Sequence, residues 1–186
     1  MNLSEKQDIS TLEPLIEAVR GGVESTGWEV SGLQKTTSHQ FEGKWEGEST
    51  RSAYLFFHLP NGSEYVSIDV YLDETSQGLT GNFALVVDLA SFVDLGDPED
   101  ALRSFAALSS RVLPDRHTRP FALRFRLRDS SDEPSGAETE VRFKLQLPRR
   151  AIGHGAAVVR QFAAKTVKAF EVILSSDELA THLPTD

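Results

Sequence analysis

The chain contains no cysteine and no long apolar run. A protein without cysteine cannot build a disulfide framework, a cysteine-ligated zinc or iron–sulfur site, or a thiol nucleophile. Its N-terminal segment carries acidic side chains where an export signal would have an apolar stretch. No segment approaches the roughly 18 apolar residues of a membrane-spanning helix. We therefore expect a globular, cytoplasmic protein with no membrane segment.

The sequence also lacks the motifs that most often mark an enzyme. It has no G-x-S-x-G turn for a serine nucleophile and no complete glycine-rich phosphate loop. Its five histidines show neither H-x-x-x-H nor H-E-x-x-H spacing. Acidic side chains on neighbouring strands could serve general acid–base catalysis, but any solvated strand face has them too. We expect no catalytic residues, no metal and no cofactor.

Apolar residues recur at steps of three and four near the N-terminus, which predicts a helix over about residues 11–25. Ser10 and Glu13 have the spacing of a capping box, in which each side chain bonds the backbone amide of the other at the start of a helix. Gly21, Gly22 and Gly27 are then expected to end this helix.

Two further helices are predicted later in the chain. Asp97 is a good N-cap residue followed by a proline, and the helix that it begins ends before Pro114. A long apolar stripe predicts the last helix over about 151–174. Residues 1–9 and 175–186 are expected to be loosely ordered tails, with one capped turn in the second.

The other segments alternate apolar and polar residues with the period of half-buried strands. Residues 60–63 have the composition of a turn, and together with their flanks they predict a hairpin. Ala84 and Val86 add apolar side chains to the second face of the strand at 79–89, which indicates a central strand. The strands are expected near 28–30, 41–45, 53–59, 66–72, 79–89, 121–127 and 141–147.

These elements predict that residues 1–186 form a single two-layer α+β domain. Its antiparallel sheet has five or more strands. An N-terminal, a middle and a long C-terminal helix pack against this sheet. We find no internal repeat and no linker longer than the loop at 129–139.

Charge is unevenly distributed along the chain. Residues 1–118 carry 8 basic and 19 acidic side chains, residues 119–168 carry 11 and 5, and residues 169–186 carry 0 and 4. The net charge of −9 therefore includes a basic segment between two acidic ones. Such an asymmetry bears on partners and solubility rather than on the fold.

The basic segment contains a set of bases that strand periodicity places on one face. Because the apolar residues of the last two strands face the core, the alternate residues emerge together as a basic ladder. Acidic side chains on neighbouring strands, such as Asp69 and Asp73, would pair with this ladder and leave a solvated mosaic. The alternative is an open surface that receives an acidic partner segment, with Tyr65 and Tyr71 nearby. The ladder consists of Arg124, Arg126, Arg128, Arg142 and Lys144.

A second candidate site lies at the start of the last helix. Arg149 and Arg150 precede Gly153 and His154, whose backbone amides are placed to bind an anion. In the simpler interpretation, the glycine only adjusts the passage from strand to helix and His154 only caps that helix.

Nucleic acid is not the expected partner of the basic segment. Its aromatic residues alternate into the core, where they cannot stack on bases. The net charge of −9 also repels phosphate groups at long range.

The order of elements resembles that of a known family. The pair Gly27-Trp28 after the first helix, the strands FALRFRLRD and TEVRFKLQL, and the closing FEVIL resemble the bacterial YbjN-type family. That family is similar in fold to the class I type III secretion chaperones, which are small, acidic, cytosolic and usually dimeric. The strand at 79–89 and the loop at 129–139 are additions to this pattern. The resemblance implies a partner-binding module without chemistry of its own.

Two functions from different classes follow from these observations. The first is a non-enzymatic, chaperone-like or regulatory module that binds a partner polypeptide through a sheet or helix surface and forms a homodimer. The alternative is a small-ligand or anion-binding α+β domain, with or without enzymatic activity. Its pocket lies between sheet and helix and is lined by Arg149, Arg150, His154 and the arginines of the sheet. The acidic surface of residues 1–118 supports a third hypothesis, a toxin-, DNA- or immunity-type decoy.

Overall fold

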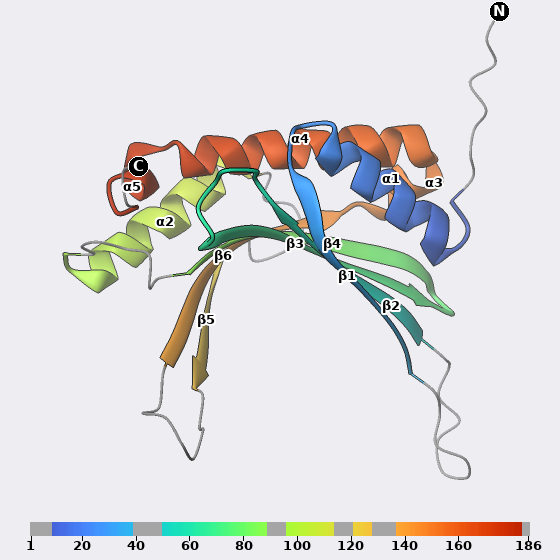
Figure 1. Ribbon diagram of the computed structural model, residues 1–186, viewed down its shortest axis with the longest axis horizontal. Coiled ribbons are helices and arrows are strands. Elements are labelled where there is room, and N and C mark those ends of the chain that lie inside the picture. Colours follow the sequence, from blue (N-terminus) through green and yellow to red (C-terminus); the bar gives the residue numbers. More distant parts are fainter. Residues whose placement is uncertain (1–8, 39–49, 89–95, 114–120, 128–136, 184–186) are drawn as a thin grey trace, which may run out of the picture.

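The helices lie on one side of a curved antiparallel sheet (Figure 1). The computed structural model describes residues 9–38, 50–88, 96–113, 121–127 and 137–183. The predicted α+β architecture, with N-terminal, middle and long C-terminal helices, is confirmed. The elements are α1 (Leu12–Glu24), β1 (Glu29–Ser38), β2 (Thr50–His58), β3 (Val66–Thr75), β4 (Gly78–Asp88), α2 (Pro98–Val112), β5 (Phe121–Leu127), β6 (Ala137–Leu147), α3 (Arg149–Gly153), α4 (Ala156–Leu174) and α5 (Asp177–Ala180).

The six strands are ordered β1-β2-β3-β4-β6-β5, and every neighbouring pair is antiparallel. The predicted hairpin at 60–63 joins β2 to β3, with Asn61 at the positive φ that such turns require. Gly78 has φ 105° where β3 turns into β4. β4 is a central strand, as Ala84 and Val86 predicted, since it lies between β3 and β6 and both side chains are buried.

Alternate residues of the strands form the core against the helices, and we call this side of the sheet the covered face. Trp28 enters the same core just before β1, and its indole N–H donates to Glu171 of α4 at 3.2 Å. Phe41 and Trp45, which were expected to extend this pattern, lie outside the described residues. Apolar side chains that are fully buried on the covered face of the sheet are Ala53, Leu55, Phe57, Ile68, Leu72, Phe83, Leu85, Val87, Val141 and Phe143.

The predicted span of α1 is confirmed, but its capping box is not formed. The N-cap residue is Thr11, whose side chain makes no capping hydrogen bond to the described residues. The backbone amide of Leu12 instead donates to the Glu74 carboxylate on β3 at 2.7 Å. Arg51 of β2 pairs with both Glu13 and Glu74. A charged acceptor brought close by the tertiary fold therefore replaces the local cap.

Gly21 and Gly22 do not end α1, contrary to the prediction. They lie inside the helix, which continues to Glu24. A Cβ atom on Gly22 would come within 2.4 Å of the Arg160 carbonyl oxygen and 2.7 Å of the Ala163 Cβ. This glycine thus lets α1 come close to the backbone of α4, a role that helical periodicity does not reveal.

The predicted helix over 151–174 is divided into α3 and α4. Gly155 lies between them with φ 95°, a conformation that a continuous right-handed helix cannot include. Beyond α4, the expected loose tail carries α5, whose Leu179 is fully buried. Arg111 of α2 donates to Glu178 of α5 at 2.6 Å.

The start of α2 follows the prediction. One carboxylate oxygen of Asp97 accepts the amides of Glu99 at 2.9 Å and Asp100 at 3.3 Å, and the proline stands in the first turn. The helix ends at Val112, before Pro114. Across the described ranges, no helix has both the length and the apolar character needed to span a bilayer.

Candidate functional site: the open face of the sheet

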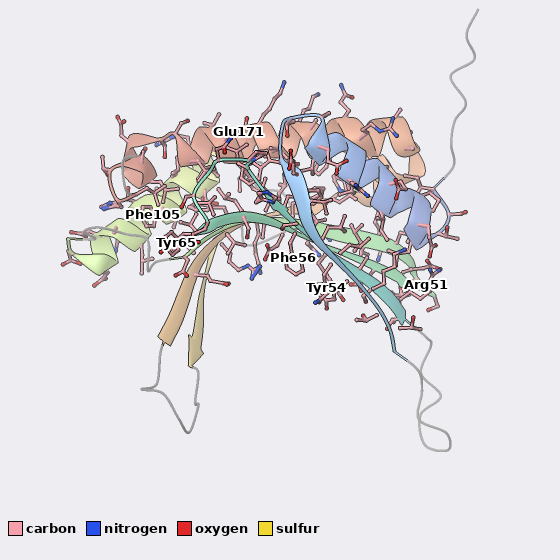
Figure 2. All side chains as sticks on the ribbon, viewed as in Figure 1. Arg51, Tyr54, Phe56, Tyr65, Phe105 and Glu171 are labelled. Carbon is pink, nitrogen blue, oxygen red and sulfur yellow. The ribbon has the colours of Figure 1, made fainter. Side chains whose placement is uncertain are left out.

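The second face of the sheet, which we call the open face, is turned away from the helices. The sheet curves so that this face is concave, and the described helices all lie on the opposite side (Figure 1). Strand alternation sends Leu55 and Phe57 into the core and therefore sends Tyr54 and Phe56 to the open face. Figure 2 shows these two side chains below the sheet, away from α1 and α4.

Three aromatic side chains gather on the open face over β2 and β3, and we call them the aromatic cluster. Tyr54 and Tyr71 are directly opposite in register, with ring centroids 4.7 Å apart and planes tilted by 40°. Tyr54 is 38% exposed. Phe56 lies over Gly32 of β1, where a Cβ atom would be only 3.2 Å from its Cδ2. The missing side chain of Gly32 thus leaves room for the Phe56 ring, which completes the cluster.

A carboxylate adjoins the aromatic cluster. Asp73 lies directly opposite Ser52, whose hydroxyl donates to Oδ1 at 2.5 Å. Burial raises the pKa of Tyr71 to about 12, and a hydrogen bond to Asp73 adds to this shift. Among the described residues, Asp73 receives these hydroxyl bonds but has no basic partner. It therefore presents an ordered negative charge that is not neutralised by an ion pair with them.

The central arginine of the predicted basic ladder is paired internally. Arg142 of β6 reaches across β4 to Asp69 of β3 and also donates to Glu140 at 3.3 Å. Ser67 donates to the second oxygen of Asp69 at 2.9 Å. The Arg142 side chain is only 13% exposed. At this position the structure therefore contains internal ion pairs and not a free basic surface.

The other ladder residues are placed by register rather than by contacts. Arg124 of β5 is opposite Glu140, and Arg126 is opposite Glu138, so the hairpin does not align base with base as expected. Lys144 is exposed and opposite Ala84 of β4. Arg128 and the side chains of β5 lie outside the described residues. The register therefore sets Arg124 and Arg126 opposite acidic residues of β6 and not opposite other bases.

The candidate anion site is not a cradle of free amides. The backbone N–H of His154 donates to carbonyl groups of Arg150 and Ala151 in α3, and the N–H of Gly155 donates to Ile152. The side chains of Arg149, Arg150 and His154 are exposed on the surface, not between sheet and helix. The small-ligand alternative, which has these residues lining a pocket between sheet and helix, stays a prediction.

The described residues contain no group of three or more histidine, aspartate or glutamate side chains close enough to hold a metal ion. Each buried side-chain nitrogen or oxygen atom within them has a hydrogen-bond partner.

The aromatic cluster was not predicted as a unit. Tyr65 and Tyr71 were both expected near the basic ladder, but Tyr65 lies in the connection between β2 and β3, outside the aromatic cluster. The predicted turn at 60–63 places Tyr54 opposite Asp69, whereas the register of β2 and β3 pairs Tyr54 with Tyr71. Strand alternation could therefore put both rings on one face, but it could not place them opposite each other.

Comparison of the chain with protein-family models, curated proteins and solved structures found no match. The resemblance to the YbjN-type family, and the homodimer that it implies, therefore stay predictions.

Proposed function

We propose that this protein is a non-enzymatic interaction module that holds an extended segment of a partner polypeptide on the open face. The observation that carries the proposal is the aromatic cluster on a concave face that the described helices leave uncovered. Single exposed apolar residues are common on any surface, but grouped tyrosine and phenylalanine side chains are typical of interfaces. Their rigid rings offer a large contact area for little loss of conformational entropy.

The side chains beside the cluster suit a polypeptide. A row across the sheet, perpendicular to the strands, combines the two tyrosines with amide side chains and carries no charge. Amide groups both donate and accept hydrogen bonds, as the backbone of a bound segment requires. This row consists of Gln34, Tyr54, Tyr71, Asn82 and Gln146.

A peptide-display selection tests the proposal. We expect the wild-type protein to enrich a set of peptides from a random library, and Tyr54→Ser to lose that enrichment. Tyr65→Ser is the matched control, because Tyr65 is 40% exposed, close to the 38% of Tyr54, but lies outside the aromatic cluster. Thermal unfolding of each variant shows that the fold is retained.

Two outcomes contradict the proposal. One is the absence of any enriched peptide with a folded wild-type protein. The other is enrichment that Tyr54→Ser leaves intact, which would move binding to a different surface.

A further inference from the structure

We infer that the bound segment is cationic, and that one of its arginine or lysine side chains lies on the Tyr54 and Tyr71 rings with its charge close to Asp73. This inference rests on the proposed function, because it names the chemistry of the segment that the open face holds. It differs from the sequence-based hypothesis of an acidic segment on the basic ladder.

The aromatic rings supply the first part of the recognition. A cation is attracted to the face of an aromatic ring when it lies within about 6 Å of the ring centroid. The Tyr54 and Tyr71 rings are tilted rather than stacked flat, and Tyr54 retains 38% of its surface for contact. Both rings project from the sheet, so they are held by two rigid strands and not by a loop.

Asp73 supplies the second part. It lies two residues from Tyr71 on the same face of β3, and its partner Ser52 lies two residues from Tyr54 on β2. The carboxylate is oriented by hydroxyl groups, which donate hydrogen bonds but bring no positive charge. A guanidinium or ammonium group placed over the rings would therefore find an ordered carboxylate beside it, and the two contacts reinforce each other.

Charge distinguishes the part of the open face that holds Asp73 from the part that holds Arg142. Asp69 and Glu140 each form an ion pair with Arg142, so both carboxylates beside that arginine already have a basic partner. Asp73 has no such basic partner among the described residues. Residues 1–118, which contain the aromatic cluster, carry 8 basic and 19 acidic side chains, so the long-range field also favours a cationic partner.

The inference is tested with three synthetic decapeptides of alternating threonine and one variable residue, which is arginine, citrulline or glutamate. Citrulline has the shape of arginine without its charge. Fluorescence anisotropy should show binding of the arginine peptide, about tenfold weaker binding of the citrulline peptide, and the weakest binding of the glutamate peptide. The affinity for the arginine peptide should fall as salt is raised, because exposed charges are screened.

Substitutions identify the site. Tyr54→Phe keeps an aromatic face and should change the affinity for the arginine peptide by less than about twofold, whereas Tyr54→Leu keeps only apolar area and should weaken it about fivefold. Asp73→Asn should weaken it about threefold to fivefold. Glu64→Gln is the matched control for net charge, since Glu64 is exposed in the connection between β2 and β3, and it should have no effect beyond about twofold.

The inference and the proposed function fail in different ways. The inference is overturned if the arginine and citrulline peptides bind equally well, or if the arginine peptide does not bind. It is also overturned if neither Tyr54→Leu nor Asp73→Asn changes the affinity for the arginine peptide. Peptides enriched by display on the open face that lack arginine and lysine would also overturn it and leave the proposed function standing. A display selection without enrichment would instead remove the proposed function.

Discussion

The two faces of the sheet are ordered by different physical means. On the covered face, residues such as Phe57 and Phe83 are fully buried against helices, and apolar contact excludes water. On the open face, Ala84 and Val86 are also buried, although the described helices lie on the other side. There the Arg142–Asp69 ion pair spans β4, and the aromatic cluster fills the next part of the surface. The sheet thus buries apolar side chains on both faces. Helices cover them on the covered face, and polar side chains of the sheet itself cover them on the open face.

Two adjacent phenylalanines on β2 measure the difference between the faces. Phe57→Ala should lower the free energy of unfolding by about 3–5 kcal/mol, because it leaves a cavity in the core. Phe56→Ala should cost about 1 kcal/mol, since Phe56 is half-buried on the open face and water can fill the space. Chemical denaturation of both variants provides the test. Equal costs would mean that the open face is packed like a core.

Two adjacent glycines of α1 test how closely the helix layer is packed over the covered face. Gly22→Ala should lower the free energy of unfolding by about 1–3 kcal/mol, because its methyl group meets the α4 backbone. Gly21→Ala meets only the flexible Arg160 side chain at 3.3 Å and should raise stability by about 0.5–1 kcal/mol, as alanine favours a helix. Thermal unfolding checks both. A stabilising Gly22→Ala would contradict the close approach of α1 and α4.

The ion pairs of the open face should contribute less than the core but more than an ordinary surface pair. Arg142→Met keeps the aliphatic stem and should cost about 1–2 kcal/mol, because Asp69 and Glu140 lose their partner. Lys144 is the next residue of β6 on the same face and is exposed. Lys144→Met should therefore change the free energy of unfolding by less than about 0.5 kcal/mol. A double-mutant cycle with Asp69→Asn isolates the pair. A coupling energy near zero would mean that Arg142→Met loses stability through lost packing and not through the lost ion pair.

The smallest expected effect is a pH dependence on the open face. The folded pKa of Tyr71 is about 12, above its ordinary value of 10.0. Since the folded state holds the phenol proton more tightly, its contribution to stability is complete below pH 10 and is lost as the pH rises from 10 to about 12. The stability of the wild-type protein relative to Tyr71→Phe should therefore fall over this interval. A difference that stays constant to pH 12 would contradict the raised pKa.

Sequence patterns predicted the elements better than the places where elements meet. Alternation located β2 to β6, and Asp97 with its proline located the start of α2, because these signals are local. The cap of α1 on Glu74 and the crossing at Gly22 were missed, because both depend on residues that are distant in the chain. The same limit applies to the site: strand periodicity put Arg142 on the open face, but only the strand order showed that Asp69 neutralises it.

The bond from the Leu12 amide to Glu74 has a consequence for how the chain folds. The two residues are 62 positions apart, and an isolated helix of 13 residues is marginally stable in water. Glu74 is held in place by the pairing of β3 with β2, where it lies opposite Arg51. We therefore expect the first turn of α1 to gain its cap only once the β2–β3 hairpin has formed. α1 precedes these strands in the chain, yet its folding should be completed after theirs.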